Sequence, residues 1–145
     1  MIKVYFDGLC QPRNPGGVAT YGFVVYERGK RLHAERGLAA APWTPRATNN
    51  VAEYSGVVKA LEWLAANGKK KKRVVVRGDS QLAIRQLNGE YKVKSPNVAP
   101  LFARARELSF QFSSLRFEWI PREQNREADA LTNLAYAEFE SSAPP

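Results

Sequence analysis

The sequence predicts an α/β fold in which helices cover a mixed five-stranded sheet. Two observations support this prediction. Three consecutive β-rich runs precede residue 40, whereas the rest of the chain alternates segments of helical periodicity with two short β-rich runs. Consecutive strands favour an antiparallel meander, and strands separated by helices favour parallel neighbours joined by crossovers. The expected order of elements is therefore β-β-β-α-β-α-α-β-α.

The N-terminal part of the chain is expected to form the antiparallel meander. Residues 2–7 alternate between apolar and other side chains, as in a strand with one buried face. The segment 8–18 is rich in glycine and proline and is expected to be a loop. Two further β-rich runs, 20–26 and 31–38, are separated by a short turn that contains glycine. This pattern is typical of a β-hairpin.

The middle of the chain changes to helical periodicity. Residues 48–50 are N-cap residue types, and apolar residues then recur at helical spacing as far as Asn67-Gly68, a helix stop signal. Residues 73–78 contain three consecutive valines and are expected to form a strand that is buried on both faces. A short helix is expected at 80–87.

Two more helices and one strand complete the expected fold. Pro96 and Pro100 bracket the start of a helix that should run to about residue 112. Residues 115–120 alternate and should form the last strand, and residues 126–139 should form the closing helix. We therefore expect one domain over residues 1–139 and a flexible tail over residues 140–145.

The composition restricts the class of protein. The 145 residues include 22 Lys and Arg against 14 Asp and Glu, a formal net charge of +8, which suits a polyanionic partner such as nucleic acid. Other basic classes, such as ribosomal or membrane-surface proteins, stay open. Cys10 is the single cysteine, so neither an intrachain disulfide nor a thiolate metal cluster is expected. No signal pattern and no membrane-length apolar run is present, which favours a cytoplasmic protein.

Four carboxylates stand at informative places in the expected fold. Asp7 and Asp79 close expected strands, and Glu53 and Asp129 lie in the first turns of expected helices. In an open α/β sheet, the ends of neighbouring strands and the starts of adjacent helices converge. Four acids gathered at such a place would repel one another unless a positive charge lay between them. The pattern predicts a divalent metal site.

Each carboxylate also has an ordinary explanation. Asp7-Gly8 is a common turn pair, and Glu53 follows Asn50 by three residues, as in a capping box. Asp79 could cap the next helix, and the helix dipole favours Asp129 in a first turn. Glu53 is the exception, because Val57 and its neighbours place it close to the apolar face of its helix. A capping role does not require that direction.

Taken together, these motifs resemble type 1 ribonuclease H over residues 2–137. No single motif would be specific, but four of them occur in order and each carries one acid. The short form of the family, which is found in archaeal and some bacterial members, is the most similar. The matching segments are Phe6-Asp7-Gly8 with Asn14-Pro15-Gly16, Thr48-Asn49-Asn50-Val51-Ala52-Glu53, Gly78-Asp79-Ser80-Gln81, and Asn125-Arg126-Glu127-Ala128-Asp129.

The resemblance implies a ribonuclease H-like fold and an endonuclease that cuts the RNA strand of RNA–DNA hybrids. It also implies that Asp7, Glu53, Asp79 and Asp129 are catalytic metal ligands for Mg²⁺, with Mn²⁺ as a substitute. Two hard cations about 3.5–4 Å apart can activate water, align it with the scissile bond and neutralise the leaving oxygen. The products would carry 5′-phosphate and 3′-hydroxyl ends.

The resemblance implies substrate contacts as well. Asn14, Asn49, Asn50 and Gln81 resemble the amides that contact the minor groove, where a 2′-hydroxyl distinguishes RNA from DNA. A second group resembles a pocket for a phosphate of the DNA strand. Its members are Arg46, Thr48 and Asn125, of which Thr48 and Asn125 have N-capping as an equally good explanation.

The chain departs from better-known members in two places. Their histidine before the last acid is absent, since the only histidine is His33 in an expected strand, and Arg122 is the candidate to take over part of that role. Their basic helical protrusion is also absent, although Lys92 and Lys94 remain as candidate contacts to the DNA backbone. Trp43 could stack on substrate, but we expect it to fold onto the sheet edge.

Three functional hypotheses follow. The leading one is a monomeric nuclease for RNA–DNA hybrids without an obligate protein partner. A second keeps the fold and metals but acts on duplex RNA or DNA junctions; the amides argue against substrates made of DNA alone, and duplex RNA stays open. The third is a non-catalytic nucleic-acid-binding module, which is disfavoured because all four acids are present.

Overall fold

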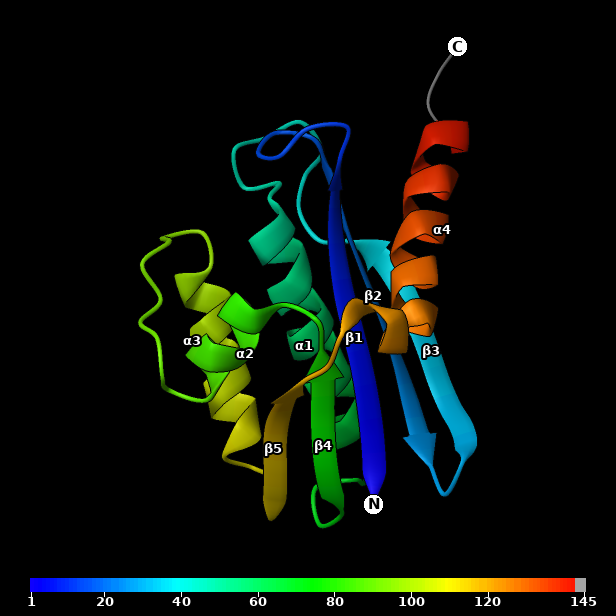
Figure 1. The fold of residues 1–145 in the computed structure, drawn as a ribbon, viewed down its shortest axis with the longest axis vertical. Coiled ribbons are helices and arrows are strands. Elements are labelled where there is room, and N and C mark those ends of the chain that lie inside the picture. Colours follow the sequence, from blue (N-terminus) through cyan, green and yellow to red (C-terminus); the bar gives the residue numbers. More distant parts are fainter. Residues whose placement is uncertain (143–145) are drawn as a thin grey trace.

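A computed structural model describes residues 1–142 as a five-stranded sheet with helices on both faces (Figure 1). The strand order is β3-β2-β1-β4-β5; β1, β2 and β3 are antiparallel, and β4 and β5 run parallel to β1. This arrangement confirms the predicted fold class. The strands are β1 (Ile2–Gln11), β2 (Val18–Glu27), β3 (Lys30–Leu38), β4 (Arg73–Gly78) and β5 (Ser114–Trp119).

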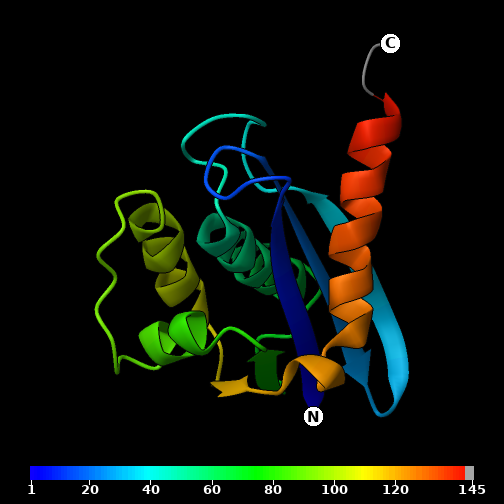
Figure 2. The same cartoon turned by 45° about the horizontal axis from the view of Figure 1, so that its top comes forward.

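Three helices lie on one side of the sheet and one lies on the other (Figure 2). Helices α1, α2 and α3 share one side, and α4 packs across the antiparallel strands on the opposite side. No helix among residues 1–142 is long and apolar enough to cross a membrane. The helices are α1 (Asn49–Ala66), α2 (Gln81–Leu87), α3 (Ala99–Ser109) and α4 (Arg126–Ser142), with a 3₁₀ turn, η1 (Arg122–Gln124), before α4.

The main hydrophobic core lies between the sheet and α1. Ile2, Val4 and Phe6 point into it from β1, as the alternation predicts, and Val74 and Val76 join them from β4. Alternate side chains of a strand face opposite sides of the sheet, so Asp7 must face the α4 side. Asp7 is therefore placed on the side of the sheet opposite to the apolar residues of β1.

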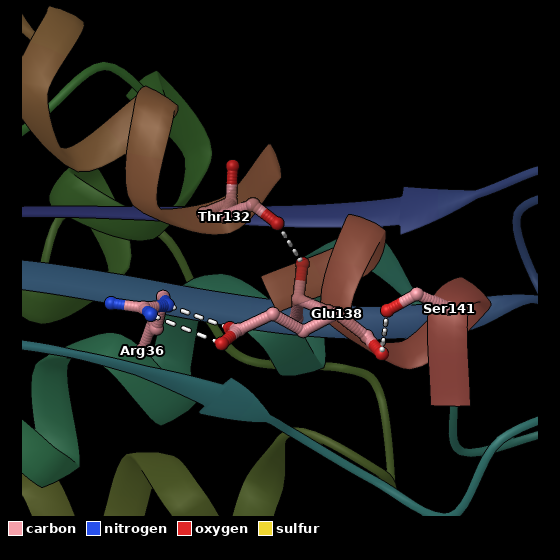
Figure 3. Close-up of polar contacts among 5 residues, drawn as sticks. Arg36, Thr132, Glu138 and Ser141 are labelled. Carbon is pink, nitrogen blue, oxygen red and sulfur yellow. Dashed lines mark hydrogen bonds and ion pairs between the residues drawn. The ribbon is translucent and has the colours of Figure 1, made fainter. Parts of the chain in front are cut away.

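Helix α4 is attached to the antiparallel strands by polar contacts (Figure 3). The Arg36 guanidinium of β3 donates two hydrogen bonds to the Glu138 carboxylate, with N···O distances of 2.7 and 3.0 Å. Deeper in the interface, the Thr20 hydroxyl donates to the backbone carbonyl of Thr132 at 2.9 Å. The first contact is exposed and the second is buried, so the buried one contributes more to the position of the helix.

Strand β1 extends further than predicted. It continues to Gln11, four residues past the expected end, because its antiparallel pairing with β2 runs on to Gln11 opposite Val18. Its parallel pairing with β4 ends much earlier, at Tyr5 opposite Arg77. Cross-strand pairing overrides the turn preference of Asp7-Gly8 here. The prediction that Asp7 closes a strand is therefore wrong, and Asp7 lies within β1 at the point where β4 diverges.

Other boundaries differ by a few residues. The hairpin is confirmed, and Arg28 and Gly29 form its two-residue loop with φ angles of 53° and 76°. Helix α3 ends at Ser109 rather than near residue 112, and α4 continues to Ser142 rather than ending at residue 139. Half of the expected tail is thus helical, and residues 143–145 lie outside the described part of the chain.

Candidate functional site

Asp7 is held rigidly in the middle of the longest strand pair. It lies opposite Gly22 of β2, and its carboxylate accepts a hydrogen bond from the Gly8 amide at 2.8 Å. Only 6% of the residue is exposed. Because the backbone is extended here, the turn explanation for Asp7-Gly8 is excluded.

Glu53 lies one turn deeper in α1 than predicted. The N-cap is Thr48, whose hydroxyl accepts from the Val51 amide at 3.0 Å, so Glu53 has no part in a capping box. Helix α1 crosses β1 in close contact at Gly8, where a Cβ atom would lie 2.3 Å from the Glu53 amide nitrogen. Glu53 is 4% exposed, and its Oε2 atom has no hydrogen-bond partner among residues 1–142.

Asp79 follows β4 directly but does not cap α2. The cap is Ser80, whose hydroxyl accepts from the Ala83 amide at 3.1 Å. The Trp119 indole donates to the backbone carbonyl of Asp79 at 3.1 Å and fixes the chain there. The carboxylate is therefore available for another role.

Asp129 lies in the first turn of α4, as predicted. This helix comes close to β2 at Gly22, where a Cβ atom would lie 2.7 Å from Leu131 Cβ and 2.9 Å from the Ala128 carbonyl oxygen. The same glycine is the cross-strand neighbour of Asp7. The absence of a side chain at Gly22 therefore brings α4, and with it Asp129, toward Asp7.

The four carboxylates meet in one open cleft of about 470 Å³. One oxygen from each of Asp7, Glu53 and Asp79 lies within 4.8 Å of the others, and Asp129 lines the same cleft. Burial, followed by the charges of Asp79 and Asp129, raises the pKa of Asp7 from 3.8 to about 8. Burial and the charges of Asp7 and Asp79 likewise raise the pKa of Glu53 well above its ordinary value.

The donor set fits a divalent cation. All four groups are carboxylates, the hard oxygen ligands that Mg²⁺ and Mn²⁺ prefer, and the unpartnered Glu53 Oε2 faces like charges. Buried carboxylates without a positive partner are costly. A cation between them would remove that cost, so the geometry supports the predicted metal centre.

Arg122 of η1 lines this cleft, opposite in charge to the carboxylates. Burial raises the pKa of Asp79, whereas the Arg122 guanidinium lowers it. The predicted accessory residue is therefore brought to the site. His33 is not: it stacks on Trp63 at 4.6 Å between ring centroids and contacts Glu35 at 3.2 Å, which is a structural position.

Comparison with known proteins finds a family model and several relatives that match most of this chain. A protein-family model described as reverse transcriptase-like matches residues 6–135. Ribonuclease HI of Halobacterium salinarum is 38% identical over 134 residues, which are 92% of this chain and 63% of that protein. The crystal structure of RNase H1 from the same organism has a TM-score of 0.82 at 33% identity and covers 94% of this chain and 98% of that one. The chain belongs to the type 1 ribonuclease H family.

Two further relatives define the extent of the similarity. LC11 ribonuclease H1, whose structure was solved with an RNA/DNA hybrid, has a TM-score of 0.83 at 37% identity, covering 95% of this chain and 98% of that one. The bifunctional protein Rv2228c of Mycobacterium tuberculosis is 36% identical over 135 residues, which are 92% of this chain but 35% of that protein. This ribonuclease H therefore spans about a third of the length of its mycobacterial relative.

Of the amides expected to contact the minor groove, one lines the carboxylate cleft and the others lie in neighbouring segments. Asn49 lines it directly, and the Asn14 side-chain oxygen accepts from the Asn49 amide at 3.1 Å. Gln81 begins α2, beside Ser80 at the cleft wall. Asn50 lines a second groove of about 560 Å³ between α1 and α2, together with Lys92 and Lys94. The two predicted lysines therefore border the same groove as Asn50.

The expected phosphate pocket is only partly assembled. Arg46 and Thr48 share the loop before α1, but Asn125 is 1% exposed and donates to the Phe6 carbonyl at 2.8 Å. Asn125 lies at the start of α4 beside Asp79, close enough for its amide to lower the pKa of Asp79. Its position is structural, so the structure does not support the pocket assignment.

Asn97 is the polar residue that the sequence analysis missed near this loop. Its side-chain amide donates to the Pro45 carbonyl at 3.5 Å, next to Arg46, and the residue is partly exposed. It reaches the loop from the segment before α3, 52 positions away in the sequence. The only local signal was an asparagine between Pro96 and the start of α3.

Proposed function

We propose that this protein is an endoribonuclease that hydrolyses the RNA strand of RNA–DNA hybrids and leaves 5′-phosphate and 3′-hydroxyl ends. The observation that carries the proposal is the convergence of Asp7, Glu53 and Asp79, whose carboxylate oxygens lie within 4.8 Å of one another, with Asp129 beside them. The relative that was solved with an RNA/DNA hybrid supports the choice of substrate.

We assign the four carboxylates as ligands of two Mg²⁺ ions, with Mn²⁺ as a substitute. Cations bound there would supply an activated water and neutralise charge on the leaving oxygen. The protein contributes rigidity: Asp7 is fixed within β1, and Glu53 is fixed by the close crossing of α1 over Gly8. Arg122 adds a positive charge on the solvent side of the cleft, where a substrate phosphate can be held.

The choice of a hybrid rests on two groups of residues. Asn14, Asn49, Asn50 and Gln81 offer amide donors and acceptors around the cleft, which suit the 2′-hydroxyls of an RNA strand. Arg46 and Thr48 offer a cation and a hydroxyl for a phosphate of the DNA strand, and Asn97 takes the place that we first gave to Asn125. Lys92 and Lys94 extend the basic surface.

The whole proposed site comes from one chain, so we propose a monomeric enzyme without an obligate protein partner. We also propose that it acts in the cytoplasm. The net charge of +8 suits a polyanionic substrate and makes binding sensitive to salt.

Cleavage of defined duplexes tests the proposal. Labelled RNA–DNA hybrid, duplex RNA and duplex DNA would be incubated with the wild type, with Asp79→Asn and with the surface control Glu107→Gln, in Mg²⁺, Mn²⁺ or chelator. We expect only the RNA strand of the hybrid to be cut. Chelator and Asp79→Asn should abolish cutting, and Glu107→Gln should not affect it.

Other outcomes identify the alternatives. Cleavage of duplex RNA would widen the substrate class, and cleavage of duplex DNA would contradict the assignment of the amides. Wild-type cleavage that survives chelator would contradict the metal mechanism. Binding of hybrid without cleavage in any metal would leave a nucleic-acid-binding module.

A further inference from the structure

Trp43 is an exposed aromatic residue in an unfavourable backbone conformation. Its side chain is bulky, yet its φ angle is 65°, in the left-handed region that favours glycine. The residue is 53% exposed. Strained residues of this kind persist only where the surrounding structure holds them, and they cluster at functional sites.

The surrounding loops hold Trp43 in this conformation. The Trp43 amide donates to the Gly17 carbonyl at 2.9 Å, and the Gly16 amide donates to the Ala47 carbonyl at 2.9 Å. The two segments lie side by side at the same end of the molecule in both ribbon views (Figures 1 and 2). These contacts tie the loop before α1 to the loop between β1 and β2.

Arg13 places a cation beside the ring. Its guanidinium carbon lies 5.9 Å from the centroid of the Trp43 ring, and its Nε donates to the Gly16 carbonyl at 3.1 Å. Among residues 1–142, no carboxylate forms an ion pair with Arg13. The guanidinium is thus oriented through one nitrogen, and its remaining donors are available for an anion.

The ring of Trp43 contacts α4. Phe139 lies 6.3 Å from Trp43 between ring centroids, at an interplanar angle of 58°. The ring thus contacts a helix side chain beside the end of β3, and about half of Trp43 stays exposed. Phe139 supports the ring without covering it.

The pair of Trp43 and Arg13 continues the surface that we assign to the substrate. Arg13 precedes Asn14, whose side chain contacts the start of α1, and Trp43 lies in the same loop as Arg46 and Thr48. A phosphate group and an apolar sugar face are the units that alternate along a DNA strand. A ribose would place a 2′-hydroxyl over the apolar indole, where it would lose hydrogen bonds to water.

We propose that Trp43 and Arg13 form an outer contact for the DNA strand of the hybrid, beyond the Arg46 and Thr48 pocket. Arg13 binds a backbone phosphate, and the Trp43 ring packs against the adjacent deoxyribose. The contact lies away from the carboxylates, so it strengthens binding only of hybrids long enough to reach it. This inference rests on the proposed hybrid specificity.

Cleavage of hybrids of graded length, from about 6 to about 16 base pairs, tests the contact. On the longest hybrid, Trp43→Ala should raise KM about three- to tenfold with kcat unchanged. On the shortest hybrid, its KM should equal that of the wild type. Arg13→Gln should lower the slope of log KM against log salt by about one on long hybrids only.

Phe139→Ala is the matched control, because it removes the packing partner of the ring and leaves the exposed surface in place. A similar loss of Tm in Phe139→Ala and Trp43→Ala, with a KM increase only in Trp43→Ala, supports the proposal. A KM increase of equal size on short and long hybrids, or no increase on either, overturns it.

Binding separates this inference from the proposed activity. Anisotropy of a labelled 16-base-pair hybrid would be measured in the Asp79→Asn background, with and without Trp43→Ala. Weaker binding on Trp43→Ala supports the contact even if no variant cleaves. Equal affinity of the two proteins overturns the contact, even if the wild type cuts hybrids as proposed.

Discussion

Glu53 shows most clearly how function opposes stability at the level of one residue. It is 4% exposed, its Oε2 atom lacks a partner within the described chain, and burial, followed by the charges of Asp7 and Asp79, raises its pKa. Such a group destabilises the metal-free fold whenever it is charged. It is conspicuous because no ordinary structural role explains it.

Replacing Glu53 by glutamine should therefore have opposite effects on stability and activity. Without metal, we expect the Tm at neutral pH to rise by about 2–5 °C, because glutamine removes both the buried charge and the proton uptake that the raised pKa of Glu53 imposes on folding. Cleavage of hybrid in Mg²⁺ should fall by more than about a hundredfold, because a ligand is lost. Calorimetry and initial rates check both. Glu62→Gln, on α1 outside the cleft and half-exposed in a weak ion pair with Arg104, should change neither. An unchanged Tm in Glu53→Gln would contradict the raised pKa of Glu53.

A substitution of Arg122 should change two quantities in opposite directions: the Mg²⁺ requirement and the KM for hybrid. Removal of its guanidinium by Arg122→Ala leaves the carboxylates more negative, so the Mg²⁺ concentration for half-maximal activity should fall about two- to fivefold. The KM for hybrid should rise about three- to tenfold, because a phosphate partner is lost. In Arg122→Lys, the Mg²⁺ requirement and the KM should both lie closer to their wild-type values. Arg126→Ala is the control and should change neither. A parallel increase in both quantities would contradict the assigned position.

The sequence predicted which acids reach the site better than it predicted where individual side chains point. All four acids reach one cleft, as their motifs indicate. The burial of Asn125 could not be predicted, because the sequence does not reveal that its amide would turn inward to the Phe6 carbonyl. Asn97 was missed because its neighbour in space, Pro45, is 52 positions away. Long-range side-chain contacts of this kind have no periodic signal.

At the level of elements, the end of the β1–β4 ladder defines the site. The periodicities located nearly every element, but Asp7-Gly8 looked like a turn and is extended strand. Local turn preference is weaker than a continuous ladder with β2. The lengths of paired strands depend on partners elsewhere in the chain, so the sequence alone placed Asp7 near the correct point and for a partly wrong reason.

The close approach of α4 to β2 gives an element-level prediction. In Gly22→Ala the new methyl would meet Leu131 and the Ala128 carbonyl, so α4 must move outward and carry Asp129 away from Asp7. We expect a loss of about 1–3 kcal/mol in the free energy of unfolding and a lower kcat. In the control Gly37→Ala the methyl meets only the ring of Tyr21, at 3.1 Å or more, and the ring can shift. Urea titration and initial rates distinguish the two, and equal behaviour of both variants would exclude this role for Gly22.

At the level of the whole molecule, a protein with net charge +8 concentrates its acids at one place. The raised pKa of Asp7 has a consequence for stability. Its folded value of about 8 exceeds the ordinary 3.8, so the fold binds a proton that the unfolded chain releases. The contribution of Asp7 to stability is therefore most favourable below about pH 4, and it falls as the pH rises toward 8.

We accordingly expect the Tm of the metal-free protein to fall between about pH 5 and pH 8, and Mg²⁺ to restore it most strongly at the alkaline end. Thermal scans in chelator and in Mg²⁺ across this range check the prediction. In Asp7→Asn the difference between the two conditions should be small at every pH. A Tm in chelator that rises with pH would contradict the direction of the shift.

The hydrogen bond from Asn125 to the Phe6 carbonyl joins the first strand to the last helix across 119 positions. It lies where β1 no longer pairs with β4, and it helps to bring Asp129 to three other carboxylates that come from the first 79 residues. During synthesis, a chain that has emerged only as far as β5 would carry three of the acids but not the fourth. The fourth acid joins the site only after Asn125 and the start of α4 have emerged, so the nascent chain should gain its nuclease activity late.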